Sequence, residues 1–183
     1  MPSDQPSSVS AIAIRPADEA DIPAITAIYA DAVRHGTGSF EIEPPGLKEM
    51  TARWRTIEEA ELPWLVAEGA AGIVGYAYAG PYRPRPGYRG TLASSVYVAP
   101  GMQGQGTGRR LLAALLDASE AAGARQMVAT VGDSANKASI RLHAAAGFET
   151  VGILRSVGWK HGRWLDTVIM QRALGPGDGA PLD

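Results

Sequence analysis

The spacing of apolar residues changes between the first helices and the strands that follow them. A short apolar run at residues 11–14 predicts a strand, and Ile22, Ile25 and Ile28 then recur at the spacing of one helix face. A second helix is predicted over residues 47–60. Apolar and β-branched runs bounded by Gly and Pro predict strands over residues 64–68, 73–80 and 91–99.

Helices and strands alternate in the second half of the chain. Leu111, Leu112, Leu115 and Leu116 form one apolar stripe in a helix predicted over residues 106–122. The remaining predicted elements are a helix over residues 135–145 and strands over residues 127–131, 148–154 and 164–171. This order favours an α/β protein with a mixed sheet and helices on both faces.

Length and composition indicate one globular domain. The 183 residues, 45% of them apolar, suffice for one buried core, which we expect over residues 11–174. Residues 1–10 are polar and residues 175–183 are rich in Gly and Pro, so both ends are predicted to be flexible tails. Neither a signal peptide nor a transmembrane span is predicted, and we expect a cytoplasmic protein.

Charge and cysteine content narrow the partners and the chemistry. The 17 basic and 19 acidic side chains give a net charge of −2, so no strong field attracts nucleic acid or an anionic membrane. We therefore expect a small molecule or a protein as partner. The chain has no cysteine, which removes disulfides, thiolate nucleophiles and thiolate metal ligands, and no metal site is predicted.

The most informative segment is a glycine-rich run that joins a predicted strand to a predicted helix, residues 96–110 (VYVAPGMQGQGTGRR). Glycines let backbone N–H groups approach an anion, and a helix N-terminus adds partial positive charge, so the run suits a pyrophosphate. No Gly-Lys-Ser/Thr follows, which excludes a Walker A loop, and the early βαβ unit of a Rossmann turn is missing. Taken alone, the glycines could equally form a flexible turn.

Two linked motifs resemble the signatures of the GNAT superfamily of acyl-CoA-dependent acetyltransferases. Residues 103–108 (QGQGTG) match its Arg/Gln-x-x-Gly-x-Gly/Ala signature, and residues 136–148 (NKASIRLHAAAGF) look like its second signature. The runs WLVAE, YAYAGP, SVYV and KHGRW, at residues 64–68, 76–81, 95–98 and 160–164, resemble the phosphinothricin acetyltransferase-like branch. The resemblance covers residues 14–172. It implies a GNAT-type mixed, mostly antiparallel sheet, splayed between strands 4 and 5, and a homodimer.

The resemblance further implies that acetyl-CoA is the co-substrate and that its pantetheine arm lies between the splayed strands. The implied cofactor-binding residues are Val96, Tyr97, Val98, Gln103, Gly104, Gln105, Gly106, Thr107, Gly108, Arg109, Asn136 and Ser139. Taken alone, Asn136 could equally satisfy backbone donors at a helix N-terminus.

His143 is the predicted catalytic residue. Acetyl transfer to an amine needs a neutral amine, stabilisation of an oxyanion and a proton for the departing thiolate. His143 stands where many superfamily members carry a tyrosine acid, and the resembled branch uses histidine there. Histidine titrates near neutral pH and can exchange protons with either group. Outside this motif, a lone histidine would be read as a core or surface imidazole.

Ala93 departs from the pattern of the branch. The branch carries Val-Glu-x-Ser/Thr-Val-Tyr-Val, in which the glutamate is taken as the general base, whereas residues 92–98 here read LASSVYV. Because a methyl group accepts no proton, we hypothesise that His143 deprotonates the amine, directly or through water, or that the amine binds already neutral.

The acceptor site is less clear from sequence. The predicted acceptor-binding residues are Phe40, Glu41, Arg83, Tyr88, Arg89 and His161. Arginines suit a carboxylate or phosphinate, although a solvated loop over residues 81–90 is the simpler interpretation of any single one. Phe40 could equally belong to the core, and Trp159 and Trp164 are interpreted as packing or dimer contacts.

We therefore expect N-acetylation of an amino acid or an analogue such as phosphinothricin, methionine sulfoximine or methionine sulfone. A second hypothesis keeps acetyl-CoA but replaces the acceptor with a polyamine, an antibiotic or a protein N-terminus. A third is a CoA-binding protein that has lost turnover, with Ala93 as the damaged position.

Overall fold

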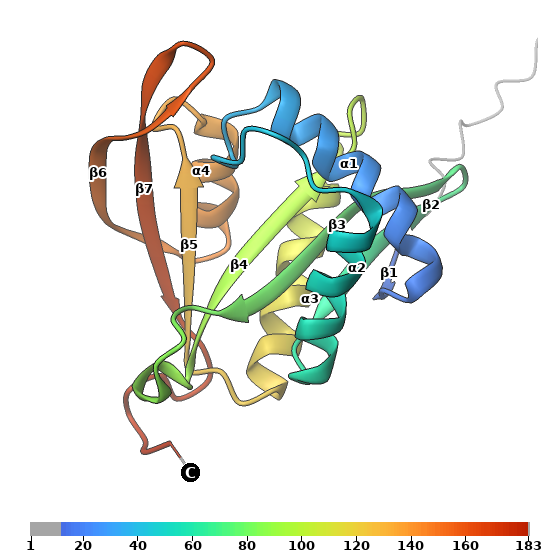
Figure 1. The fold of residues 1–183 in the computed structure, drawn as a ribbon. Helices are drawn as coiled ribbons and strands as arrows, with labels where there is room; N and C mark the ends of the chain where they lie inside the picture. The colour runs from blue at the N-terminus through green and yellow to red at the C-terminus, as the bar shows by residue number, and fades with distance from the viewer. Residues whose placement is uncertain (1–11, 183) are drawn as a thin grey trace, which may run out of the picture.

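A seven-stranded sheet runs through the centre of the computed structural model, which describes residues 12–182 (Figure 1). In sheet order the strands are β1 (Ala13–Pro16), β2 (Trp64–Gly69), β3 (Gly72–Pro81), β4 (Thr91–Val98), β5 (Gln126–Gly132), β7 (Arg163–Ala173) and β6 (Glu149–Lys160). Neighbouring strands are antiparallel except β4 and β5, which are parallel. The mixed, mostly antiparallel sheet that the resemblance implied is confirmed.

Helices cover both faces of the sheet (Figure 1). α1 (Ile22–His35) and α2 (Leu47–Glu59) pack on one face, and α3 (Thr107–Ala121) and α4 (Lys137–Ala145) pack on the other. The 3-10 turns η1 (Glu19–Asp21) and η2 (Pro86–Tyr88) precede α1 and β4. Each predicted helix and strand has a counterpart in this arrangement.

The apolar stripes predicted from residue spacing form the two cores. On α1, Ile22 and Ile25 are at most 1% exposed, and they pack with residues of α2, β2 and β3. On α3, Leu111, Leu112 and Leu115 are fully buried against the opposite face of the sheet. Burial of these side chains supplies most of the driving force for placing each helix.

β6 is longer than its sequence pattern predicted. The strand was expected to end at residue 154, but it continues to Lys160 after an irregularity between Leu154 and Gly158. Ser156 adopts a left-handed backbone with φ of 52°, and its N–H donates to Asp166 Oδ1 over 3.0 Å. The polar residues Arg155 and Ser156 lie at the bulge and end the apolar run on which the prediction rested.

β4 and β5 pair over only four residues and then separate. Residues 91–94 of β4 pair with residues 126–129 of β5, whereas residues 95–98 pair with β3 alone. The N–H of Ala99 donates to Val74 of β3 over 2.9 Å, so the alternation of backbone groups directs those of Val96 and Val98 away from β3 and into the gap. The splay between strands 4 and 5 is therefore present, and it exposes unpaired backbone groups.

The C-terminal residues fold back toward the start of β4. Leu182 fills the space beside Gly90, and Arg125 donates from Nη2 to the carbonyl of Pro181 over 3.3 Å. Flexibility of residues 175–183 stays a prediction, and the predicted tail at residues 1–10 lies outside the described residues. None of the helices within residues 12–182 has the length and apolar content needed to cross a membrane.

Candidate functional site

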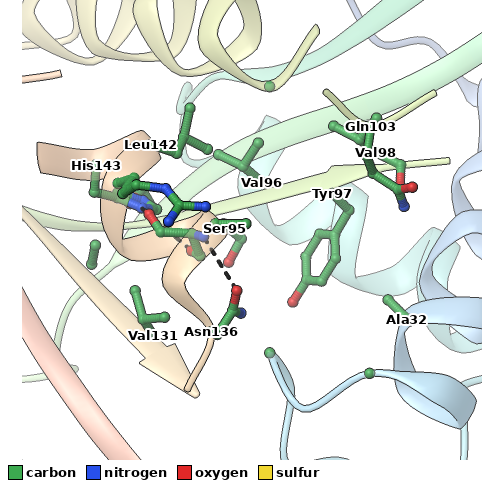
Figure 2. A pocket seen from close by; sticks show the side chains of 18 of the residues that line it. Ala32, Ser95, Val96, Tyr97, Val98, Gln103, Val131, Asn136, Leu142 and His143 are labelled. Carbon is green, nitrogen blue, oxygen red and sulfur yellow. Dashed lines mark hydrogen bonds between the residues drawn. The ribbon is translucent and has the colours of Figure 1, made fainter. Parts of the chain in front are cut away.

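The gap between β4 and β5 holds a cavity of about 550 Å³. Its walls come from the diverging strands, the glycine loop before α3, the first turns of α4 and the C-terminal end of α1 (Figure 2). The lining residues are Ala32, Gly36, Gly38, Ser94, Ser95, Val96, Tyr97, Val98, Gln103, Gly104, Gly106, Gly108, Arg109, Ala129, Thr130, Val131, Gly132, Asn136, Ala138, Ser139, Arg141, Leu142 and His143. The cavity therefore brings together both sequence motifs.

Three glycines of the loop before α3 adopt a left-handed backbone conformation. Gly101, Gly104 and Gly106 have φ of 78°, 76° and 83°, in the region that disfavours residues with a Cβ. No other atom lies within 4 Å of the position that a Cβ on any of them would occupy, so the loop surface is open. Gly106 caps α3 without a side-chain hydrogen bond. The first N–H groups of α3 are thus available to an anion.

Ten of the twelve predicted cofactor-binding residues line the cavity, and Gln105 and Thr107 do not. Gln105 donates from Nε2 to the carbonyl of Gly101 over 3.2 Å within the loop, and Thr107 is buried at the first turn of α3. Gln103 lines the cavity and donates to the carbonyl of Val98 over 3.3 Å, which faces the gap. Arg141, which was not predicted from the sequence, lines the cavity together with Arg109.

The start of α4 is fixed by two side chains. Asn136 accepts the N–H of Ser139 over 3.2 Å and caps the helix, so the capping interpretation of Asn136 applies while it also lines the cavity. Asp133 accepts the N–H of Ala135 over 2.9 Å and pairs with Arg163 of β7. Burial alone would raise the pKa of Asp133, but these hydrogen bonds outweigh it and lower the pKa. The turn that delivers α4 to the cavity is thereby tied to β7.

His143 lines the cavity as a neutral, oriented imidazole. Its Nδ1 lies 2.9 Å from the carbonyl oxygen of Ser139, which can only accept, so Nδ1 carries the proton and Nε2 is the free acceptor. Nε2 is buried without a hydrogen-bond partner among residues 12–182. Burial lowers the pKa of His143 below its ordinary value, and the bond to Ser139 offsets this in part. The ring also meets Phe148 edge to face, with centroids 5.1 Å apart.

Three of the six predicted acceptor-binding residues anchor the segment between α1 and α2 rather than line the cavity. Phe40 rests against Gly132 and Gly158, whose positions leave no room for a Cβ beside its ring. Glu41 Oε1 accepts the Tyr29 hydroxyl over 2.8 Å. His161 contacts the carbonyl of Gly36 through Nε2 at 3.2 Å.

The other three, Arg83, Tyr88 and Arg89, lie beyond the N-terminal end of β4, at the opposite end of that strand from the glycine loop (Figure 1). None of the three lines the cavity. Ala93 also lies outside the lining, paired with Gly80 of β3 and Val128 of β5. Within residues 12–182 no cluster of three or more His, Asp and Glu suited to a metal ion occurs.

The wall contributed by β5 and α1 was missed from the sequence. Residues 129–132 of β5 face the gap, and Gly36 and Gly38 close it beyond the end of α1. The implied splay between strands 4 and 5 was a usable signal for the β5 residues. The two glycines were not predicted as part of the site, because nothing local connects them to a strand more than fifty residues away.

Comparisons with known proteins agree with this geometry. The model of the acetyltransferase (GNAT) family matches residues 24–148. A phosphinothricin N-acetyltransferase of Alcaligenes faecalis is 55% identical over 92% of this chain and 85% of its own length. An L-methionine sulfoximine/L-methionine sulfone acetyltransferase of Pseudomonas aeruginosa is 45% identical over 92% of this chain and 98% of its own length. The structure of a phosphinothricin acetyltransferase from Sinorhizobium meliloti, solved with acetyl-CoA, superposes with a TM-score of 0.91 at 41% identity. The match covers 94% of this chain and 93% of that protein.

Proposed function

Because this chain belongs to the GNAT family of acetyltransferases, we propose that it transfers the acetyl group of acetyl-CoA to the primary amine of an amino acid or amino-acid analogue. The acceptors named for its relatives, phosphinothricin and methionine sulfoximine or sulfone, support this class. The observation that carries the proposal is the unpaired edge of β4, which faces a cavity that ends at the glycine loop.

The residues of the cavity fit acetyl-CoA. Backbone groups of Val96 and Val98 face the gap, where an extended pantetheine arm would add like a strand. The open glycine loop, the uncapped N-terminus of α3 and the nearby Arg109 and Arg141 suit its phosphates. When bound there, acetyl-CoA supplies an activated thioester carbonyl.

His143 is proposed as the residue that exchanges a proton with the reacting groups. Its free Nε2 can accept a proton, and the Ser139 carbonyl holds the ring in the tautomer that leaves Nε2 unprotonated. The lowered pKa keeps this form dominant at neutral pH. Phe148 packs against the ring and limits its rotation.

An acceptor panel tests the proposal. Thiol release from acetyl-CoA is measured with phosphinothricin, methionine sulfoximine, methionine sulfone and free amino acids, beside spermidine, an aminoglycoside and a short peptide. We expect turnover with the amino-acid analogues and little with the others. Preferential turnover of another amine would support the second acceptor class. Calorimetric binding of acetyl-CoA without turnover of any amine, unrestored by Ala93→Glu, would support a CoA-binding protein instead.

We also propose a homodimer that uses the outer strands of the sheet. β6 is an edge strand, and six large apolar side chains on β6 and β7 are exposed: Val151, Ile153, Leu154, Val157, Trp159 and Trp164. Such a concentration of exposed apolar surface is typical of an interface, and an unpaired edge strand can extend a sheet across it. Cytoplasmic location stays a prediction.

A further inference from the structure

The two positions that could handle the amine proton lie on opposite faces of the sheet. Along β4, Leu92 and Val96 pack with the core under α3, whereas Tyr97 packs with the core under α1 and α2. Alternation along the strand places Ala93 on the side of Tyr97. His143 instead packs against Phe148 in the core under α3. Ala93, where the branch pattern has a glutamate, and His143 therefore lie on opposite faces of the sheet.

A chain of polar side chains leads away from the cavity on the face of Ala93. Tyr97 lines the cavity, and Figure 2 shows it on the opposite side of Ser95 from His143. The ring of Tyr97 meets that of Tyr29 edge to face, with centroids 5.0 Å apart, and the pKa of Tyr97 is raised by burial and by the Tyr29 side chain, a hydrogen-bonding neighbour. The Tyr29 hydroxyl donates to Glu41 Oε1 over 2.8 Å, and the Glu41 side chain is 34% exposed. The chain therefore starts at the cavity and ends in water.

Charges around Glu41 keep its carboxylate ionised. Burial alone would raise its pKa, but hydrogen bonds from Arg53 and Tyr29 outweigh burial and lower the pKa. Arg53 comes from α2 and also pairs with Glu49, and Lys160 from β6 adds a further positive charge. A carboxylate in this state is deprotonated and able to accept a proton.

The hydroxyl groups along the chain stay protonated at neutral pH. Burial is the main cause that raises the pKa of Tyr29, to about 12, and burial also raises the pKa of Tyr97 well above its ordinary value. The other polar neighbours are Ser39, whose Oγ lies 2.9 Å from the Tyr29 hydroxyl, Tyr78 of β3, and Tyr76 of β3, whose ring stacks on that of Tyr97 with centroids 5.2 Å apart. A hydroxyl that keeps its own proton can pass one along by accepting a proton as it gives one up.

We propose that Tyr97, Tyr29 and Glu41 form the route by which the acceptor ammonium loses its proton before acetylation. The N–H bond of the ammonium breaks toward the Tyr97 oxygen, Tyr97 gives its proton to Tyr29, and Tyr29 gives its proton to Glu41. The amine becomes neutral, the carboxylate becomes a carboxylic acid, and the acid releases the proton to solvent. Tyr97 contacts the acceptor, and Tyr29 and Glu41 act through it. The inference rests on the proposed amine acetylation.

Tyr29→Phe and Glu41→Gln test the route. Tyr29→Phe keeps the ring contacts and removes the hydroxyl, whereas Glu41→Gln keeps an acceptor for Tyr29 but cannot take its proton. For each variant, kcat is measured from pH 6.5 to pH 10 with saturating acetyl-CoA and a phosphinothricin concentration that saturates the enzyme. Glu49→Gln is the matched control, because it removes the other carboxylate bound to Arg53 without touching Tyr29.

We expect both variants to lose about 10- to 100-fold in kcat at pH 7, somewhat less than the loss of a directly positioned base. The loss should become smaller as the pH rises to 10, because a growing share of the acceptor amine is then neutral without a base. Glu49→Gln should follow the wild type throughout.

Three results would overturn the route. A loss that is the same at every pH would mean that Tyr29 and Glu41 only hold the fold, and an unchanged kcat at pH 7 would mean that the proton leaves elsewhere. If the wild type acetylates no amine, the proposed function fails first and the route falls with it. Should Tyr29→Phe not fold, Glu41→Gln carries the same comparison.

Discussion

The chemistry proposed for the cavity depends most on the state of one imidazole. His143→Ala should lower kcat about 100-fold at pH 7, in the range for loss of a positioned proton-transfer group. The wild-type rate should fall as the pH decreases below the pKa of His143, which lies under its ordinary value of 6.5, because protonation of Nε2 removes the acceptor for the second proton that the amine nitrogen loses when the amide forms. The measurement is kcat between pH 6 and pH 9. Exposed His35, paired with Asp31 on α1, supplies His35→Ala as the control, and full activity of His143→Ala across this range would contradict the assignment.

The same residue makes the fold sensitive to acid. Because the pKa of His143 in the folded chain lies below its ordinary value of 6.5, the unfolded chain takes up the proton first as the pH falls. The free energy of unfolding therefore decreases as the pH drops through the interval between 6.5 and the folded value. Burial that orients the ring for chemistry thus also costs stability in acid.

At the scale of elements, Gly132 of β5 and Gly158 of β6 leave the space in which Phe40 packs the segment between α1 and α2 against the sheet. In Gly158→Ala the new Cβ would lie 2.3 Å from the Phe40 ring, so the ring, which also lies against Gly132 of the cavity lining, must move. We expect a loss of about 1–3 kcal/mol in the free energy of unfolding, as for overpacked cores, and a raised KM for the acceptor. Denaturant unfolding and initial-rate kinetics measure the two effects.

Gly152→Ala is the matched control for this prediction, since it lies on the same strand with no atom within 4 Å of the added Cβ. It should leave both quantities nearly unchanged. Phe40→Ala combined with Gly158→Ala should lose less stability than the sum of the single changes, because the clash is absent in the double variant. Additive losses would mean that the contact between Phe40 and Gly158 is not the cause.

The elements themselves were predictable because their signals are local. The stripe of Leu111 and Leu115 and the glycines at residues 104–108 each occupy a few adjacent positions, and the structure places the leucines on α3 and the glycines at its start. The contact of Phe40 with Gly132 and Gly158 was not predictable, because it joins a loop to glycines about 90 and 120 residues away in the sequence. The position of Ala93 and His143 on opposite faces of the sheet was not predicted for the same reason, because it depends on how distant strands and helices assemble.

At the scale of the whole molecule, the exposed apolar residues of β6 and β7 determine the expected assembly. Trp164→Glu combined with Val151→Glu should shift the mass in solution from that of two chains to the 19.2 kDa of one. The physical reason is that burying these side chains drives association and that charged groups oppose it. Light scattering after size exclusion measures the mass.

Leu47→Glu introduces the same charge at another exposed apolar residue, outside β6 and β7, and should leave the mass unchanged. A wild-type protein that elutes as a single chain at every concentration would contradict the dimer. A variant that remains a dimer would place the interface elsewhere on the molecule.

The short pairing between β4 and β5 means that the sheet consists of two parts, β1 to β4 and β5 to β7, held together by a seam of four residue pairs. A ligand that bridges both sides of the gap contributes directly to the cohesion of these parts. At a concentration one hundred times its dissociation constant, it would add about 2.7 kcal/mol to the free energy of unfolding. The resistance of this protein to heat and proteolysis would then follow the supply of acetyl-CoA in its surroundings.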